Sequence, residues 1–264
     1  MTSGMPDTIQ FADATALVVG GTAGVGLASA RKFAEAGVPR VAIVGRNVGR
    51  GESAAAEVRR AAPGCDVMFI SADANLASEA ERVVAEVLAR FGSIEIVLSS
   101  TVGPAAPDLL KNIPIGELEA VLVQQAMAPI LMSRAVLPFM VQARRGVILN
   151  IASDAGKLAT PGETVIGAAM AAIVMFSRAL AIEAKRDGIR VNALTPSLIE
   201  GTITHERMQQ SPFASKLFEK AGKMASLGVA QADDLADLAL FLASPAAKKI
   251  TGQAISANGG ISAA

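Results

Sequence analysis

Residues 16–26 read Ala-Leu-Val-Val-Gly-Gly-Thr-Ala-Gly-Val-Gly, an apolar run that passes directly into a glycine-rich turn. The apolar run predicts a buried strand, and the residues from Gly24 onward predict a helix. Gly20 permits a tight turn, Gly24 lets a pyrophosphate approach the backbone, and Gly26 lets helix and strand pack closely. The start of the helix offers free amides and a positive dipole end to a phosphate. The stretch therefore predicts a dinucleotide-binding turn; the alternative is an inherited tight turn that has lost its ligand.

The alternation of apolar runs and helical stretches continues along the whole chain. Apolar runs predict strands at residues 16–20, 40–44, 67–70, 94–99, 147–152, 189–194 and 254–257. Helical patterns lie between them, at residues 24–36, 50–61, 78–91, 115–143, 165–185 and 232–243. Residues 196–228 have no clear pattern and are interpreted as a mobile stretch. Apolar strands that alternate with helices predict a single α/β, doubly wound Rossmann-like domain over residues 1–264, with a parallel sheet of six or seven strands.

Composition excludes several functional classes. Of the 264 residues, 52% are hydrophobic and 18% charged, which indicates a large buried core. Lys plus Arg and Asp plus Glu both number 24, so nothing favours nucleic acid or an anionic membrane as a partner. The single cysteine, Cys65, excludes an internal disulfide, and the single histidine, His205, excludes a His-rich metal site. No signal-like segment and no run of about 18 apolar residues is present, so we expect a cytoplasmic protein without a membrane span.

The second and third strands supply the next candidates for cofactor binding. An NAD site of this type has an acidic residue about 20 residues after the turn, where this chain has Gly45 followed by Arg46. The missing acid argues against NAD, and Arg46 could instead contact the 2′-phosphate of NADP or be an ordinary solvated charge. Asp73, just after the third strand, could accept a hydrogen bond from an adenine amine or cap the following helix. The candidate cofactor-binding residues are Gly20, Gly24, Gly26, Arg46 and Asp73.

The turn, the alternation and two further stretches resemble the short-chain dehydrogenase/reductase family over residues 11–262. The further stretches are Arg-Val-Asn-Ala-Leu-Thr-Pro-Ser at 190–197 and Ile-Thr-Gly-Gln at 250–253, followed by Asn-Gly-Gly at 258–260. The resemblance implies a Rossmann-like fold and an NAD(P)-dependent oxidoreductase. It also implies dimers or tetramers formed through the long helices predicted at 115–143 and 165–185, which are heavily apolar in this chain.

The catalytic positions depart from the family pattern. Family members use Asn, Ser, Tyr and Lys, and here Gln125, Ser153, Ile166 and Met170 fall at these four positions. The four-residue spacing of Ile166 and Met170 survives on one helical face, but neither side chain exchanges a proton. The chain contains no Tyr at all. Ser153 alone is a weak nucleophile, and a capping hydroxyl is its alternative role.

Losses extend to the cofactor contacts that the family resemblance implies. Ser100, Val102 and Ser197 also differ from the family pattern around the nicotinamide. The lost lysine would cost about 1.5–3 kcal/mol of binding free energy. We therefore expect no NAD(P) binding or only weak NAD(P) binding. Four other titratable residues lie on segments that would border the ligand cleft of this fold: Asp154, Lys157, Glu163 and His205. Each is either a substitute for the lost catalytic groups or a solvated charge.

Two functions of different classes follow from these losses. The first is a non-catalytic subunit that assembles with, and supports, an active homologous NAD(P)-dependent dehydrogenase subunit. The paired-subunit hydroxyacyl-CoA dehydrogenase of anaerobic toluene (benzylsuccinate) degradation is one such arrangement. The alternative is an active NADP-dependent oxidoreductase, or a non-redox enzyme, with a rewired catalytic site. A ligand-binding sensor without turnover is a third reading. No metal site is expected.

Overall fold

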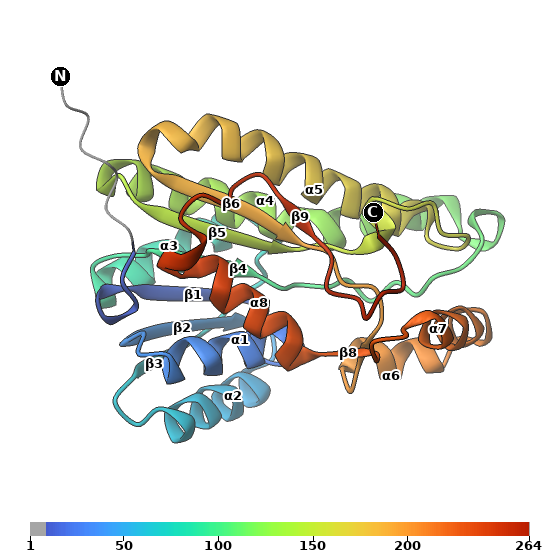
Figure 1. Ribbon diagram of the computed structural model, residues 1–264, viewed down its shortest axis with the longest axis horizontal. Coiled ribbons are helices and arrows are strands. Elements are labelled where there is room, and N and C mark those ends of the chain that lie inside the picture. Colours follow the sequence, from blue (N-terminus) through green and yellow to red (C-terminus); the bar gives the residue numbers. More distant parts are fainter. Residues whose placement is uncertain (1–8, 264) are drawn as a thin grey trace.

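A seven-stranded parallel sheet forms the centre of the computed structural model, which describes residues 9–263 (Figure 1). The strand order is β3-β2-β1-β4-β5-β6-β9, and every neighbouring pair is parallel. The strands are β1 (Thr15–Val19), β2 (Arg40–Gly45), β3 (Asp66–Ser71), β4 (Ile96–Ser99), β5 (Gly146–Ile151), β6 (Ile189–Leu194) and β9 (Ala254–Ile255). The predicted doubly wound fold with six or seven strands is confirmed.

Helices cover both faces of the sheet, which explains why its strands are apolar on both sides. One face packs against α1 (Gly24–Glu35), α2 (Val48–Ala61) and α8 (Ala232–Ala243). The other packs against α3 (Ala77–Phe91), α4 (Leu118–Ala143) and α5 (Thr164–Ala184). All five residues of β1 are buried, as a central strand between two such layers requires. The order of strands reverses between β1 and β4, and in doubly wound sheets ligands bind at this point.

The stretch 196–228 differs from its prediction. It contains α6 (Ile203–Gln209), α7 (Pro212–Met224) and β7 (Ile199–Glu200), which pairs with β8 (Ala230–Gln231). Both helices begin at side-chain caps, where Thr202 accepts from the His205 amide and Ser211 accepts from the Ala214 amide. Both helices lie away from the sheet core, beyond the carboxyl ends of the strands (Figure 1). Few of their residues are buried, so the sequence lacks the apolar pattern of a sheet-covering helix.

Helices α4 and α5 are more apolar than the sheet requires. Ile115–Ala143 and Thr164–Asp187 are each long and apolar enough to cross a membrane, by length and composition only. Both pack on the sheet and on each other, as core helices of this composition do. In the most apolar 18-residue stretch of each helix, only 39% is buried. Part of their apolar surface therefore has no partner within the described residues.

Candidate functional site

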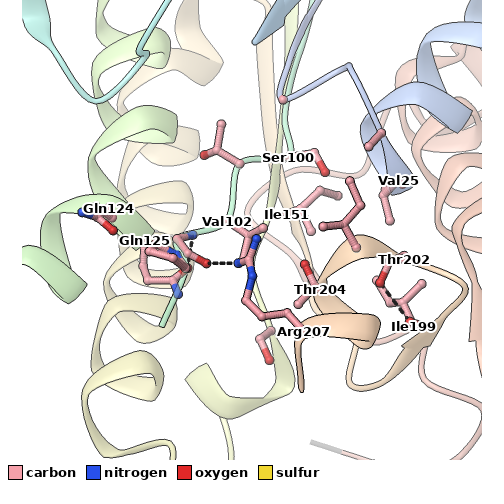
Figure 2. Close-up of a pocket in the computed structure, with 18 of the residues that line it drawn as sticks. Val25, Ser100, Val102, Gln124, Gln125, Ile151, Ile199, Thr202, Thr204 and Arg207 are labelled. Atoms are coloured by element: carbon pink, nitrogen blue, oxygen red, sulfur yellow. Dashed lines mark hydrogen bonds between the residues drawn. The ribbon is translucent and has the colours of Figure 1, made fainter. Parts of the chain in front are cut away.

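A cleft of about 330 Å³ opens at the carboxyl ends of the strands, at the point where the strand order reverses. Its walls are the turn after β1, the segments that follow β2 to β6, the start of α5, and α6. Figure 2 shows Val102 and Gln125 on one side of this cleft and Thr202 and Thr204 on the other, with Arg207 reaching across from α6. The cleft thus brings together segments that lie far apart in the sequence.

The turn after β1 has the geometry that a phosphate-binding backbone requires. Gly20 has φ +78°, and a Cβ there would lie 2.5 Å from the Ser100 carbonyl oxygen. A Cβ on Gly26 would collide with the Gly20 carbonyl oxygen, so close packing of turn and helix depends on this glycine. Gly24 has φ +51° and borders the cleft, where the nearest atom to a Cβ would be Thr202 Cγ2 at 3.5 Å. The backbone at the start of α1 is therefore open to a ligand.

The end of β2 has a cationic character in place of the acid of an NAD site. A Cβ at Gly45 would lie 2.5 Å from Thr22 Cγ2, so Thr22 occupies the space that an acidic side chain would need. Thr22 Oγ1 accepts a hydrogen bond of 3.2 Å from Arg50 Nε. Arg46 also lines the cleft, with 64% of its side chain exposed. Two guanidinium groups thus stand where a phosphate on the adenosine ribose would lie in this type of fold.

Asp73 borders the same end of the cleft and forms a local turn. Its Oδ1 accepts from the backbone amide of Asn75 at 3.1 Å and from Asn75 Nδ2 at 3.0 Å. The capping role considered for Asp73 is not observed, because α3 begins after Leu76. Its other oxygen lies 3.9 Å from Arg46 Nη1, a weak and exposed ion pair. Asp73 therefore lies beside Arg46 at the mouth of the cleft, with little effect on its position.

The four positions that correspond to the family's catalytic residues converge at the opposite end of the cleft. Ile166 and Met170 line it from one face of α5, and Met170 is buried. Ser153 also lines it, but its hydroxyl accepts from the Ala155 amide at 3.2 Å, which is a capping bond. Gln125 is buried and its Oε1 accepts from the Gly103 amide at 3.2 Å. Neither side chain of the Ile166–Met170 pair can move a proton.

The other candidate groups separate into two sets. Glu163 and His205 line the cleft, whereas Asp154 and Lys157 do not. Asp154 is buried, accepts from Ser256, Asn258 and Ser262, and lies 3.6 Å from the Lys157 ammonium. These two residues anchor the C-terminal segment, which corrects the expectation that they border the cleft. Within residues 9–263 no group of three His, Cys, Asp or Glu side chains could hold a metal ion.

Three cleft residues were not identified from the sequence. Thr22 lies inside the glycine turn. Arg50 lies in the first turn of α2, four residues after Arg46, and this second basic residue so close to the end of β2 is the signal that could have identified it. Arg207 on α6 donates to the Gly103 carbonyl oxygen at 3.2 Å. Nothing in the sequence indicated Arg207, because α6 itself was not predicted.

The residues present fit NADP at one end of the cleft and only partly at the other. The glycine turn and the two arginines suit a pyrophosphate and an additional ribose phosphate. The Thr101 hydroxyl oxygen is buried at the cleft without a hydrogen-bond partner among the described residues, so one polar group there is still unsatisfied. Val102, Ile166 and Met170 offer only apolar contacts to a nicotinamide.

Comparisons with known proteins agree with this architecture. The family described as "Enoyl-(Acyl carrier protein) reductase" matches residues 20–262. The chain is 33% identical to the 3-oxoacyl-(acyl-carrier-protein) reductase FabG of Chlamydia trachomatis, over 94% of this chain and 96% of the relative. It is also 33% identical to the 2,5-dichloro-2,5-cyclohexadiene-1,4-diol dehydrogenase LinX of Sphingobium indicum, over 95% and 97%. The crystal structure of levodione reductase superposes with a TM-score of 0.89 at 26% identity, over 95% and 98% of the two chains. The chain belongs to the short-chain dehydrogenase/reductase family.

Proposed function

We propose that the chain is an NADP(H)-binding oxidoreductase that works without the Tyr–Lys pair of its family. The observation that carries the proposal is the end of β2, where Thr22 fills the place of an acid and Arg46 and Arg50 supply positive charge. The names of FabG and LinX, a reductase and a dehydrogenase, support a redox reaction in the same fold. The affinity would come mainly from the phosphate end, consistent with the weak NAD(P) binding predicted from the sequence.

The chemistry divides between the cofactor and the protein. Bound NADPH would supply the hydride for a carbonyl or a related unsaturated group. The turn that contains Gly20 and Gly24 would hold the pyrophosphate, and Arg46 and Arg50 would hold the ribose phosphate. The apolar side chain of Ile166 would exclude water from the reacting end. The missing acid–base help is worth about 10²–10⁴ in rate, so turnover by this chain requires another proton source.

A binding and turnover experiment tests this proposal. The isolated chain is titrated with NADPH and with NADH, and NADPH oxidation is then followed at saturating cofactor with a panel of ketones and 3-oxoacyl thioesters. We expect NADPH to bind more tightly than NADH and to be oxidised slowly. A chain that fails to bind NADPH contradicts the proposal. A chain that binds NADPH but transfers no hydride points to the second candidate.

The second candidate is a non-catalytic subunit for an active homologous dehydrogenase, and the exposed apolar surface of α4 and α5 favours it. Met175 and Ile182 lie two turns apart on α5, and each is 61% exposed. Burial of such surface contributes about 25 cal/mol per Å² to association. The partner would be a homologue with the Tyr–Lys pair, and the paired enzyme of anaerobic toluene degradation is one arrangement of this kind. Further exposed apolar residues of α4 are Leu122, Val123, Phe139 and Val141.

Native mass spectrometry of co-expressed chains tests the second candidate. The wild-type chain is expressed alone and together with homologues from the same genome that carry the Tyr–Lys pair. The Ala172→Glu variant is co-expressed with the same homologues. Ala172 is exposed on α5, three residues before Met175, so the variant leaves the core unchanged and puts a charge on the exposed apolar surface of this helix. A hetero-oligomer that Ala172→Glu dissociates, with loss of the partner's activity, supports the subunit function. A wild-type chain that is monomeric or only homo-oligomeric in every co-expression contradicts it.

A further inference from the structure

Within the described residues, Glu163 is the carboxyl-bearing residue that lines the reacting end of the cleft, and the hydrogen bond from Thr160 alone does not explain a buried charge there. Glu163 lies directly before α5 and lines the cleft together with Ile166, one helical turn further along. Glutamate is not among the side chains that usually cap a helix, and the Glu163 side chain makes no capping hydrogen bond. It also makes no ion pair within residues 9–263; Thr160 is its hydrogen-bond partner. The carboxyl is therefore mostly buried without a cation.

Among the titratable residues that line the cleft, Glu163 is the one on the α5 side, next to the position of the family's tyrosine. Arg46 and Asp73 line the adenosine end, and an arginine does not release its proton at neutral pH. His205 lines the cleft from α6 and not from α5, and its ring hydrogen-bonds Gln209 at 3.2 Å. The Ser153 hydroxyl is used as a cap. Glu163 is the remaining titratable carboxyl on the α5 side of the cleft, beside the position where the family has its tyrosine.

Burial supplies the property that a general acid needs. Desolvation raises the pKa of Glu163 above its ordinary value, and this effect outweighs the opposing hydrogen bond from Thr160. A carboxylic acid whose pKa is raised stays protonated to a higher pH than an exposed one, which suits a general acid. The elements packed against Glu163 carry other charges: Lys157 beside η4 (Asp154–Gly156) is paired with Asp154, and Lys216 on α7 is exposed. Asp108 is also close, because its amide donates to the Gly162 carbonyl oxygen, and His205 and Arg207 line the same cleft.

We propose that Glu163 is the proton donor for the reduced substrate, in place of the tyrosine that this chain lacks. The inference rests on the proposed NADP(H)-dependent function. In the forward direction the carbonyl carbon gains a hydride from the reduced nicotinamide, and the carbonyl oxygen gains the proton of the Glu163 carboxyl. The substrate is reduced to an alcohol, the cofactor is oxidised, and the resulting Glu163 carboxylate regains a proton from water. The reverse reaction uses the carboxylate as the base.

The test compares Glu163→Gln and Glu163→Asp with wild type, and uses Glu206→Gln on the exposed face of α6 as a matched control. NADPH titration is measured first for every variant. The second readout is independent of activity: the carbonyl stretch of a protonated carboxyl is followed by infrared difference spectroscopy from pH 4 to 9. We expect unchanged NADPH affinity in all variants, and a carboxyl that stays protonated above the ordinary glutamate pKa and that Glu163→Gln alone removes.

Turnover with activated ketones completes the test. We expect the wild-type rate of reduction to fall as pH rises through the Glu163 titration, and Glu163→Gln to lower the rate about 10²–10⁴-fold. Glu163→Asp should retain part of the rate, and Glu206→Gln all of it. Failure of wild type to bind NADPH overturns the proposed function. The assignment of Glu163 alone is overturned if NADPH binds but Glu163→Gln keeps the wild-type rate and pH profile, if wild type reduces no activated ketone, or if Glu163 titrates at its ordinary value.

Discussion

Restoring the lost pair with Ile166→Tyr and Met170→Lys should turn the chain into an efficient reductase. Both positions line the cleft from one face of α5, so the new hydroxyl and ammonium would face the same space. A tyrosine pKa near 10 needs a nearby positive charge to fall toward neutrality, and the lysine supplies it. Each change alone should therefore do little. Met170→Lys alone should also destabilise the fold, because Met170 is buried and a lysine there lacks an anionic partner.

The expected magnitudes follow from the two groups restored. Acid–base help of about 10²–10⁴ should appear in the rate of ketone reduction at saturating NADPH. A charged hydrogen bond to the nicotinamide ribose contributes about 1.5–3 kcal/mol, so NADPH affinity should increase roughly tenfold to a hundredfold. Adding Glu163→Gln to the double variant should then have little effect, because the tyrosine has taken over the proton transfer.

The assay follows NADPH absorbance at 340 nm with one panel of ketones for all variants. Ala171→Tyr with Met175→Lys is the matched control, since it has the same spacing on α5 but lies outside the cleft, at exposed positions. The control should behave as wild type. A folded double variant with the Tyr–Lys pair that binds NADPH yet reduces ketones no faster than the control would refute the placement of these side chains at the reacting end.

Three further outcomes are expected. Gly45→Asp should weaken NADPH binding at least about tenfold, since its Cβ meets Thr22 Cγ2 at 2.5 Å and its carboxylate repels the ribose phosphate; adding Thr22→Ala should shift the preference toward NADH in calorimetric titrations. Burial raises the pKa of the Cys65 thiol to about 11, so we expect negligible reaction with a disulfide reagent at pH 8 until denaturant exposes it, and rapid modification of the native protein would contradict this. Burial raises the pKa of Glu163 because it disfavours the charged carboxylate. The contribution of Glu163 to the free energy of unfolding is therefore greatest below pH 4.5 and is lost as the pH rises through the folded-state pKa. Urea unfolding of Glu163→Gln should show a smaller loss of stability over this pH range than urea unfolding of wild type.

The sequence predicts the sheet and its covering helices well because their apolar patterns are set by burial on both faces. The run at β1 and the glycines after it are enough to locate the cleft, because a ligand site in this fold follows the first strand. The four-residue spacing of Ile166 and Met170 is likewise enough to identify them as the positions where the family has Tyr and Lys. The helices α6 and α7 escape prediction because they lie over the cleft and bury little. Their signals are the capping residues Thr202 and Ser211.

Individual side chains in the cleft are predicted less well, because their roles depend on neighbours that are distant in sequence. Asp154 and Glu163 look alike as loop acids, yet the first accepts hydrogen bonds from the C-terminal segment more than 100 residues away. Glu163 has no such donors and remains at the cleft. Likewise, the space beside Gly45 is taken by Thr22, a contact between the end of β2 and the turn after β1 that only the folded chain reveals.

The most direct measurement of the proposed function is a fluorescence titration of the isolated chain with NADPH and NADH. The protein contains neither Trp nor Tyr, so the emission change belongs to the cofactor alone. We expect saturable binding of one NADPH per chain, tighter than NADH by about tenfold or more, a difference of at least ~1.4 kcal/mol. Arg46→Ala combined with Arg50→Ala should abolish this preference without changing NADH binding. Absence of saturable NADPH binding, or equal affinity for the two cofactors in wild type, would contradict an NADP(H)-dependent function.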